Sequence, residues 1–454
     1  MTGLSLEKKS ATAVRPSKLE SSLLGLVRDG TNAQQTTFRS IKENALARLM
    51  EHGLPSRNDE AYRFSGIGTL GEREVSVRGG IAPLGTVSTA SVESRSILLQ
   101  IVNGEAVAAE DLPTGLRILR LRDALATNDT GVLQRVGTLL CAEDGFIAAN
   151  TAGFTDGYAI VVEDGAAIDT PVELRVGHGS RVPAGGTATA ACFPRVLVCL
   201  GRGSKLSLIE RHDVAGEGPS LSLGIGEIFV GDGAELEHAR WVDLGGEQAQ
   251  IAATEVTVGV GAMYRSWSVT AAGGFVRHDL RVRLAGRRAC AVLDGLYYGR
   301  KEQLADHHVQ VWHEQPEGST KECYRGVVED LGKGVFDGII YVRSGAMKTD
   351  ARQENRNLLL GPQAVVNTKP HLEIDADDVA CSHGATVGQL DENQLFYLQA
   401  RGIERELGRQ MLTWAFAKEI VERCPFAGLR RVAVDRLRGA LPDLLEHLDE
   451  GAQS

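Results

Sequence analysis

The sequence predicts a mainly β protein with a parallel β-solenoid core and helical regions before and after it. Its 454 residues include 53 glycines but only 13 prolines, which indicates many tight turns between short strands rather than a flexible linker. Between about residues 155 and 385, short β-branched runs end at glycine turns about 30 residues apart, a spacing typical of stacked coils. Outside this region, apolar residues recur at the helical steps of three and four.

The amino-terminal part, residues 1–150, is predicted to be helical and mixed. Apolar residues keep a helical period from about Ser17 to His52, and Pro55 follows as a stop signal. A strand is expected at residues 97–102, where the chain is almost wholly apolar. The solenoid core is assigned to residues 151–388 and a carboxy-terminal helical domain to residues 389–454.

Four turns define the core. Each follows a β-branched run and places a glycine before a small residue, at Gly165, Gly203, Gly233 and Gly261. The repeat has no strict hexapeptide period, so a regular left-handed helix of short coils is not expected. A β-sandwich would also generate short strands and glycine turns, and it stays open as the alternative.

The carboxy-terminal domain is predicted from its start signal and its periodicity. Asp391, with Gln394 three residues later, resembles a capping box. An apolar stripe then runs from Leu395 to Ile420, and Gly402 is expected to separate two helices.

Composition excludes several classes of protein. The net charge of −10 offers no basic face for nucleic acid. The seven cysteines are scattered without a CxxC pair, which indicates reduced thiols. There is no apolar run long enough to span a membrane and no secretory signal, so the cytoplasm is the expected compartment, although an organelle transit peptide stays open.

Two motifs that could bind nucleotide or metal are weak. The glycines from Gly326 to Gly334 have one residue too many between them for a phosphate-binding loop and lack its Ser or Thr. The run from Asp306 to His313 places His307 and His313 on one strand face, about 20 Å apart. One metal cannot bridge that distance, so structural histidines bonded to neighbouring coils are expected.

The segment Cys381-Ser382-His383 is more suggestive of chemistry. On an extended strand Cys381 and His383 project to the same face, about 6.6 Å apart at Cα. A thiolate and an imidazole both suit iron or zinc, but two ligands do not close a site. A Cys–His nucleophile with His383 or His371 as base is a weaker alternative, as is a polysaccharide-active enzyme on a β-helix.

The stretch from Asn355 to Ile403 resembles the SufB/SufD family of iron–sulfur cluster assembly proteins. It contains the family's P-x-L-E-I strand at 370–374, its C-S-H-G-A-T turn at 381–386 and its L-F-Y-L-x-S-R-G helix at 395–402, with Ala400 in place of the usual Ser. Weaker similarity extends back to about residue 50. Gly384 stands where SufB-type members have glutamate, so the form is the SufD type. A SufB-type persulfide-accepting scaffold is the alternative.

The resemblance implies a right-handed parallel β-helix and a non-enzymatic scaffold role in the SUF system, linked to iron supply. It implies a heterodimer with a SufB-like paralogue, with a homodimer possible in isolation. His383 would face the paralogue, with Cys381 beside it, and hold iron or a nascent cluster transiently. The chain itself would bind no nucleotide. A SufC ATPase would dock on the carboxy-terminal helices, through Leu395, Phe396, Tyr397, Leu398 and Arg401.

Overall fold

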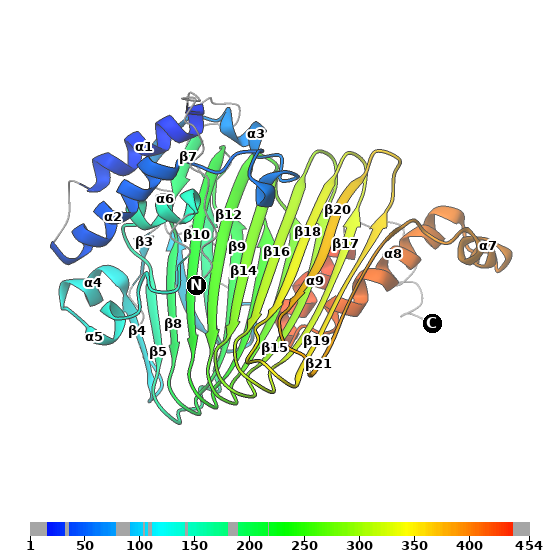
Figure 1. The fold of residues 1–454 in the computed structure, drawn as a ribbon. Coiled ribbons are helices and arrows are strands. Elements are labelled where there is room, and N and C mark those ends of the chain that lie inside the picture. Colours follow the sequence, from blue (N-terminus) through cyan, green and yellow to red (C-terminus); the bar gives the residue numbers. More distant parts are fainter. Residues whose placement is uncertain are drawn as a thin grey trace.

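The computed structural model describes residues 16–31, 36–78, 91–102, 105–107, 111–140, 144–179, 189–216 and 218–438. It is a β-solenoid with helices at both ends, which confirms the predicted fold class (Figure 1). Successive strands of the core alternate between two sheets, so each coil contributes one strand to each sheet. The core strands are parallel; two pairs at the start of the fold, β4–β5 and β2–β3, are antiparallel.

The first sheet runs from the amino-terminal end of the solenoid to β20. Its strands are β4 (Leu116–Arg120), β5 (Tyr158–Val162), β8 (Arg195–Leu200), β10 (Ser220–Val230), β12 (Gln248–Val258), β14 (Phe275–Leu284), β16 (Leu304–His313), β18 (Lys333–Val342) and β20 (Val365–Ile374), with β1 (Val75–Arg78) and β7 (Thr189–Cys192) on a side branch.

The second sheet faces the first and ends at β21. Its strands are β3 (Glu105–Ala106), β2 (Ile97–Val102), β6 (Val172–His178), β9 (Lys205–Val214), β11 (Glu235–Asp243), β13 (Met263–Ala272), β15 (Cys290–Gly299), β17 (Ser319–Val328), β19 (Thr349–Leu359) and β21 (Val379–Gly388). Strands β2 and β4 precede residue 151 and still join the sheets, and the division into three domains stays a prediction.

The predicted glycine turns are the corners of successive coils. Gly165, Gly203, Gly233 and Gly261 all have positive φ, a conformation that glycine adopts without steric cost. The corners are stacked by hydrogen bonds between neighbouring coils, such as Gly233 N to Val260 O at 2.8 Å. This stacking decides in favour of the solenoid over the sandwich.

Helices cover the outer face of each sheet. On the first sheet lie α1 (Lys18–Thr31), α2 (Thr36–His52), η1 (Glu60–Tyr62), α3 (Ile67–Gly71) and α6 (Gly145–Gly153), with α4 (Leu121–Ala126) and α5 (Thr130–Leu133) at its first edge. On the second sheet lie α8 (Arg405–Val421) and α9 (Ala427–Arg438), where the Trp267 indole N–H donates to Ile420 O at 2.8 Å.

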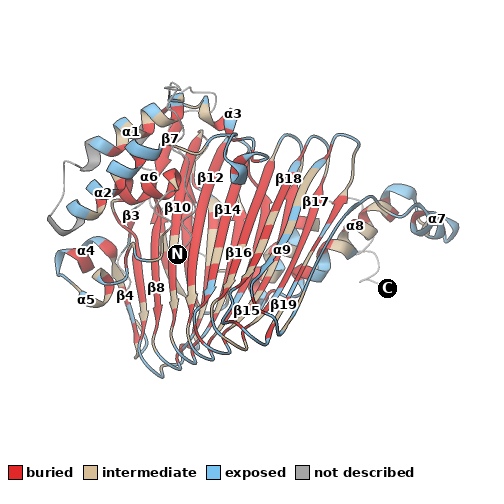
Figure 2. Ribbon diagram, in the orientation of Figure 1, coloured by how far each residue is buried: buried red, intermediate tan, exposed pale blue. Residues whose placement is uncertain are grey.

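The apolar core lies between the two sheets, with two further apolar layers under the helices. Figure 2 shows the middle strands buried along most of their length, whereas α7 (Glu392–Ala400) is largely exposed. Among the described residues, no helix is both long and apolar enough to cross a membrane. The six described cysteines are free thiols, and Cys141 lies outside the described residues.

Candidate functional site

Cys381 and His383 lie on β21, the last strand of the second sheet. Parallel pairing sets Cys381 beside Ala351 and His383 beside Gln353. Ala351 belongs to the core between the sheets, and Cys381 packs against that core. Because side chains alternate along a strand, His383 lies on the same inward face, as the sequence predicts.

The coil formed by β20 and β21 is the open end of the solenoid. Within the part of the chain that the structure describes, both sheets stop there, so these strands pair with a neighbour on one side only. The His383 side chain is exposed and Cys381 is half-buried. Three apolar side chains of this coil, Val365, Ile374 and Val387, are exposed as well. An exposed edge of two ten-residue strands is a template for pairing with another chain.

The environment of Cys381 does not favour a reactive thiolate. Burial raises the pKa of its thiol, and Asp350 raises that pKa further. Activated cysteines instead sit beside cations or helix amino termini. His371 is exposed on β20 in the other sheet, on the strand face opposite Leu372, which packs on the core. The alternation thus directs His371 away from Cys381. This arrangement does not favour His371 as a base for the Cys381 thiol.

The histidine-rich strand β16 carries structural histidines. His307 and His313 share the inward face, and each bonds a threonine of the facing sheet, Thr270 at 3.1 Å and Thr320 at 2.9 Å. Burial lowers the pKa of His307 to about 3 and that of His313 to about 4. No group of three or more potential ligands in the described ranges could hold a metal.

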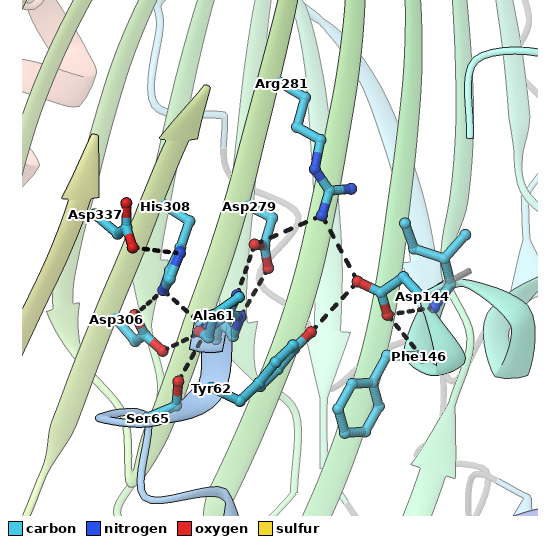
Figure 3. A network of polar contacts seen from close by, with 12 residues as sticks. Ala61, Tyr62, Ser65, Asp144, Phe146, Asp279, Arg281, Asp306, His308 and Asp337 are labelled. Atoms are coloured by element: carbon cyan, nitrogen blue, oxygen red, sulfur yellow. Dashed lines mark hydrogen bonds and ion pairs between the residues drawn. The ribbon is translucent and has the colours of Figure 1, made fainter. Parts of the chain in front are cut away.

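The outward face of the same region carries a row of charges under the amino-terminal segment (Figure 3). The Arg277 guanidinium bonds Asp279, Asp306, His308 and the carbonyl of Ala61 at 2.8–2.9 Å. Further charges continue the row on both sides: Arg281 pairs with Glu255 and Asp144, and His308 lies 4.0 Å from Asp337. Within this row Arg277 bonds both the carboxylates of the first sheet and the Ala61 carbonyl, so the row anchors the segment around Tyr62 to the first sheet.

The residues predicted to dock an ATPase lie on α7, which projects beyond the last coil (Figure 1). The Asp391 side chain caps α7 by accepting from Asn393 N at 2.8 Å, and Gly402, with φ +86°, separates α7 from α8. Phe396, Tyr397 and Arg401 are exposed, whereas Leu395 is buried and Leu398 is half-buried against α8.

The run from Gly326 to Gly334 comprises the end of β17, a corner and the start of β18. A phosphate-binding loop leads into a helix, and here a strand follows. Two other polar residues, Glu322 and Gln353, are buried on the inward faces of β17 and β19 and were not predicted from the sequence. In the sequence, each of them alternates with residues of the outward strand face, and this alternation is the signal that could have placed them on the inward face.

Comparison with known proteins agrees with this arrangement. The family model described as SUF system FeS cluster assembly, SufBD core domain, matches residues 183–416. The iron–sulfur cluster assembly protein SufD of Escherichia coli is 30% identical over 417 residues, covering 90% of this chain and 95% of the relative. The chloroplastic protein ABCI7 of Arabidopsis thaliana is 29% identical over 413 residues, covering 89% and 86%.

A SufBD-family protein of Synechocystis is 27% identical over 392 residues, covering 83% of this chain and 85% of the relative. The matches therefore extend over the helices as well as the solenoid. The chain belongs to the SufBD family of iron–sulfur cluster assembly proteins.

Proposed function

We propose that the chain is a non-catalytic scaffold subunit of the SUF machinery, in which His383 holds iron or a nascent iron–sulfur cluster at an interface with a SufB-like paralogue. The observation that carries this proposal is the open last coil, where His383 is exposed on the inward face of an unpaired edge. A second solenoid placed end to end would cover the exposed apolar residues of β20 and β21 and bring its own ligands to His383.

The ligand chemistry supports a shared site. A neutral imidazole nitrogen is a good ligand for iron, but one histidine leaves most coordination positions open. Cys381, two residues away on the same face, is the second donor, and it must lose its proton to bind. The iron or cluster is cargo that passes through the site, so the partner's ligands can complete the coordination and later release it.

The carboxy-terminal helices supply the second contact of this proposal. Phe396 and Tyr397 on α7 form an exposed patch with Arg401 at the carboxy-terminal cap of that helix, and the Arg401 guanidinium lies 5.0 Å from the Tyr397 ring centroid. Exposed aromatic residues beside an arginine are typical anchors of protein interfaces. We assign this patch to a SufC-type ATPase, which binds the nucleotide that the chain itself does not. The cytoplasm is the expected compartment.

The test is anaerobic co-purification of the tagged chain with co-expressed SufB-type and SufC-type subunits, with subunits and bound iron measured together. His383→Ala is expected to keep the complex but lose iron. His371→Ala, an exposed histidine on the neighbouring strand of the same coil, is the matched control and should keep both. Unchanged iron in His383→Ala would overturn the ligand role. No complex with the unaltered chain would overturn the scaffold role.

A further inference from the structure

Two buried polar residues stand directly behind His383 in the stack of coils. Pairing aligns Glu322 of β17 with Gln353 of β19, and Gln353 with His383 of β21. Figure 1 shows these three strands side by side at the end of the second sheet. Strands in a sheet are about 4.8 Å apart, so each of these side chains is within reach of the next. All three lie on the inward face.

Glu322 and Gln353 bond to each other, but each has an oxygen atom without a hydrogen-bond partner among the described residues. Gln353 Nε2 donates to Glu322 Oε1 at 3.2 Å, and both residues are only 3% exposed. Gln353 Oε1 and Glu322 Oε2 have no hydrogen-bond partner among the described residues. A buried acceptor without a donor is costly, so the unpartnered oxygen of Gln353 points to a donor among its neighbours.

The Gln353 side chain has two register neighbours, Glu322 on one side and His383 on the other. Glu322 occupies the side toward β17. On the facing sheet Gly338 lies so close that an added Cβ would be 2.3 Å from Gln353 Nε2. The remaining register neighbour is His383, whose ring carries one N–H when it is neutral.

We propose that His383 donates its ring N–H to Gln353 Oε1, and that Gln353, held by Glu322, is the positioning residue that sets the tautomer and orientation of the His383 ring. Metal-binding histidines usually donate their second nitrogen to such an acceptor, which leaves the lone pair of the other nitrogen for the metal. The inference rests on the proposed function, because it concerns how His383 is presented to iron.

An amide acceptor suits a site that must release its cargo. A carboxylate at position 353 would compete with His383 as a ligand for the iron. The carboxyl group of Glu322 is one strand further from His383, and burial raises its pKa to about 8, so it is neutral at physiological pH. The pair therefore orients the ring without placing a fixed negative charge behind it.

The test is the tautomer of His383 in the iron-free chain, read from imidazole ¹⁵N chemical shifts at pH 7, below the pKa of Glu322. The His383 signals are assigned by subtracting the spectrum of His383→Ala. One tautomer is expected to dominate in the unaltered chain. Gln353→Met has the same length but no amide, and is expected to shift the ring to a mixture of both tautomers. Arg352→Gln, on the exposed face of the same strand, should leave the ratio unchanged.

A folded Gln353→Met variant with an unchanged tautomer ratio would overturn the proposal. Should Gln353→Met fail to fold, Gln353→Asn takes its place. This variant keeps the amide on a shorter side chain, and the same change in the tautomer ratio is expected. Glu322→Gln retains an oxygen for Gln353 Nε2 and should rescue the ratio that Glu322→Leu loses. Because the tautomer is measured without iron, this test does not depend on iron binding. If Gln353→Met shifts the ratio while His383→Ala retains iron, the ligand role of His383 is rejected and the positioning role of Gln353 still holds.

Discussion

The guanidinium carbon of Arg277 lies 3.9 Å from the centroid of the Tyr62 ring. Arg277 belongs to β14 in the middle of the solenoid and Tyr62 to η1 near the amino terminus. The same guanidinium bonds the Ala61 carbonyl and the Ser65 hydroxyl. One buried cation therefore attaches the amino-terminal segment to the first sheet.

Arg277→Met is expected to destabilise the protein by about 3 kcal/mol, because removing one partner leaves buried carboxylates of Asp279 and Asp306 without their cation. Urea unfolding measures the loss. Arg283→Met is the matched control: this arginine of the same strand also lies over an aromatic ring, that of Trp312, but its side chain is 46% exposed. Its loss should cost less than about 1 kcal/mol. Equal losses would contradict the anchoring role.

Glu322→Gln should become more stable than the unaltered chain as pH rises. Burial raises the pKa of Glu322 from 4.5 to about 8, so its stabilising contribution is complete below pH 4.5 and is lost as pH rises toward 8. Within that window the difference between the two proteins should change by about 1.4 kcal/mol per pH unit at most. Urea unfolding at pH 5, 7 and 9 measures it, with Glu302→Gln, at an exposed turn, as the control. A flat difference would show that Glu322 is ionised in the folded protein.

Val387→Lys is expected to abolish association with the SufB-like paralogue while the chain stays folded. The side chain is 45% exposed on the open edge, where a lysine opposes edge-to-edge pairing. Val260→Lys, 46% exposed at a solenoid corner, is the matched control and should leave association intact. Size-exclusion chromatography of the co-expressed subunits measures association for both variants. If Val387→Lys still associates, the interface does not lie at this edge.

Replacing Phe396 and Tyr397 together by serine should abolish binding of the SufC-type ATPase with little change in stability. These side chains are 71% and 57% exposed on α7, so they contribute little to the folded core. Phe64→Ser, 50% exposed near the amino terminus, tests whether any exposed aromatic residue has the same effect. Pull-down and thermal unfolding give the two readouts. Normal binding by the double variant would exclude α7 as the docking site.

Gly261→Ala should destabilise the solenoid by about 1 kcal/mol, because its φ of +62° is costly for any residue with a Cβ. Thermal unfolding is the measurement. Gly246→Ala is the control, since Gly246 has neither a positive φ nor an atom near an added Cβ, and it should be neutral or slightly stabilising. Equal effects would mean that the corner conformation is not what requires glycine.

Local features could be predicted from the order of the amino acids: the glycine corners from Gly165 to Gly261, the alternation that sends His307 and His308 to opposite faces, and the break at Gly402. Each depends on the conformation or period of a few adjacent residues. The later corners, at Arg288, Glu317 and Lys348, have the same positive φ without glycine. There the stacked coils impose the conformation, and composition gave no signal.

Contacts between residues of different coils could not be predicted in this way. The alignment of Glu322, Gln353 and His383 depends on the register of three strands that are about 30 residues apart in sequence, and the contact of Arg277 with Tyr62 depends on how the amino-terminal segment crosses the first sheet. Such pairings are set by corner lengths and packing summed over many residues. For that reason the motif Cys381-Ser382-His383 was visible in the sequence, but the acceptor behind it was not.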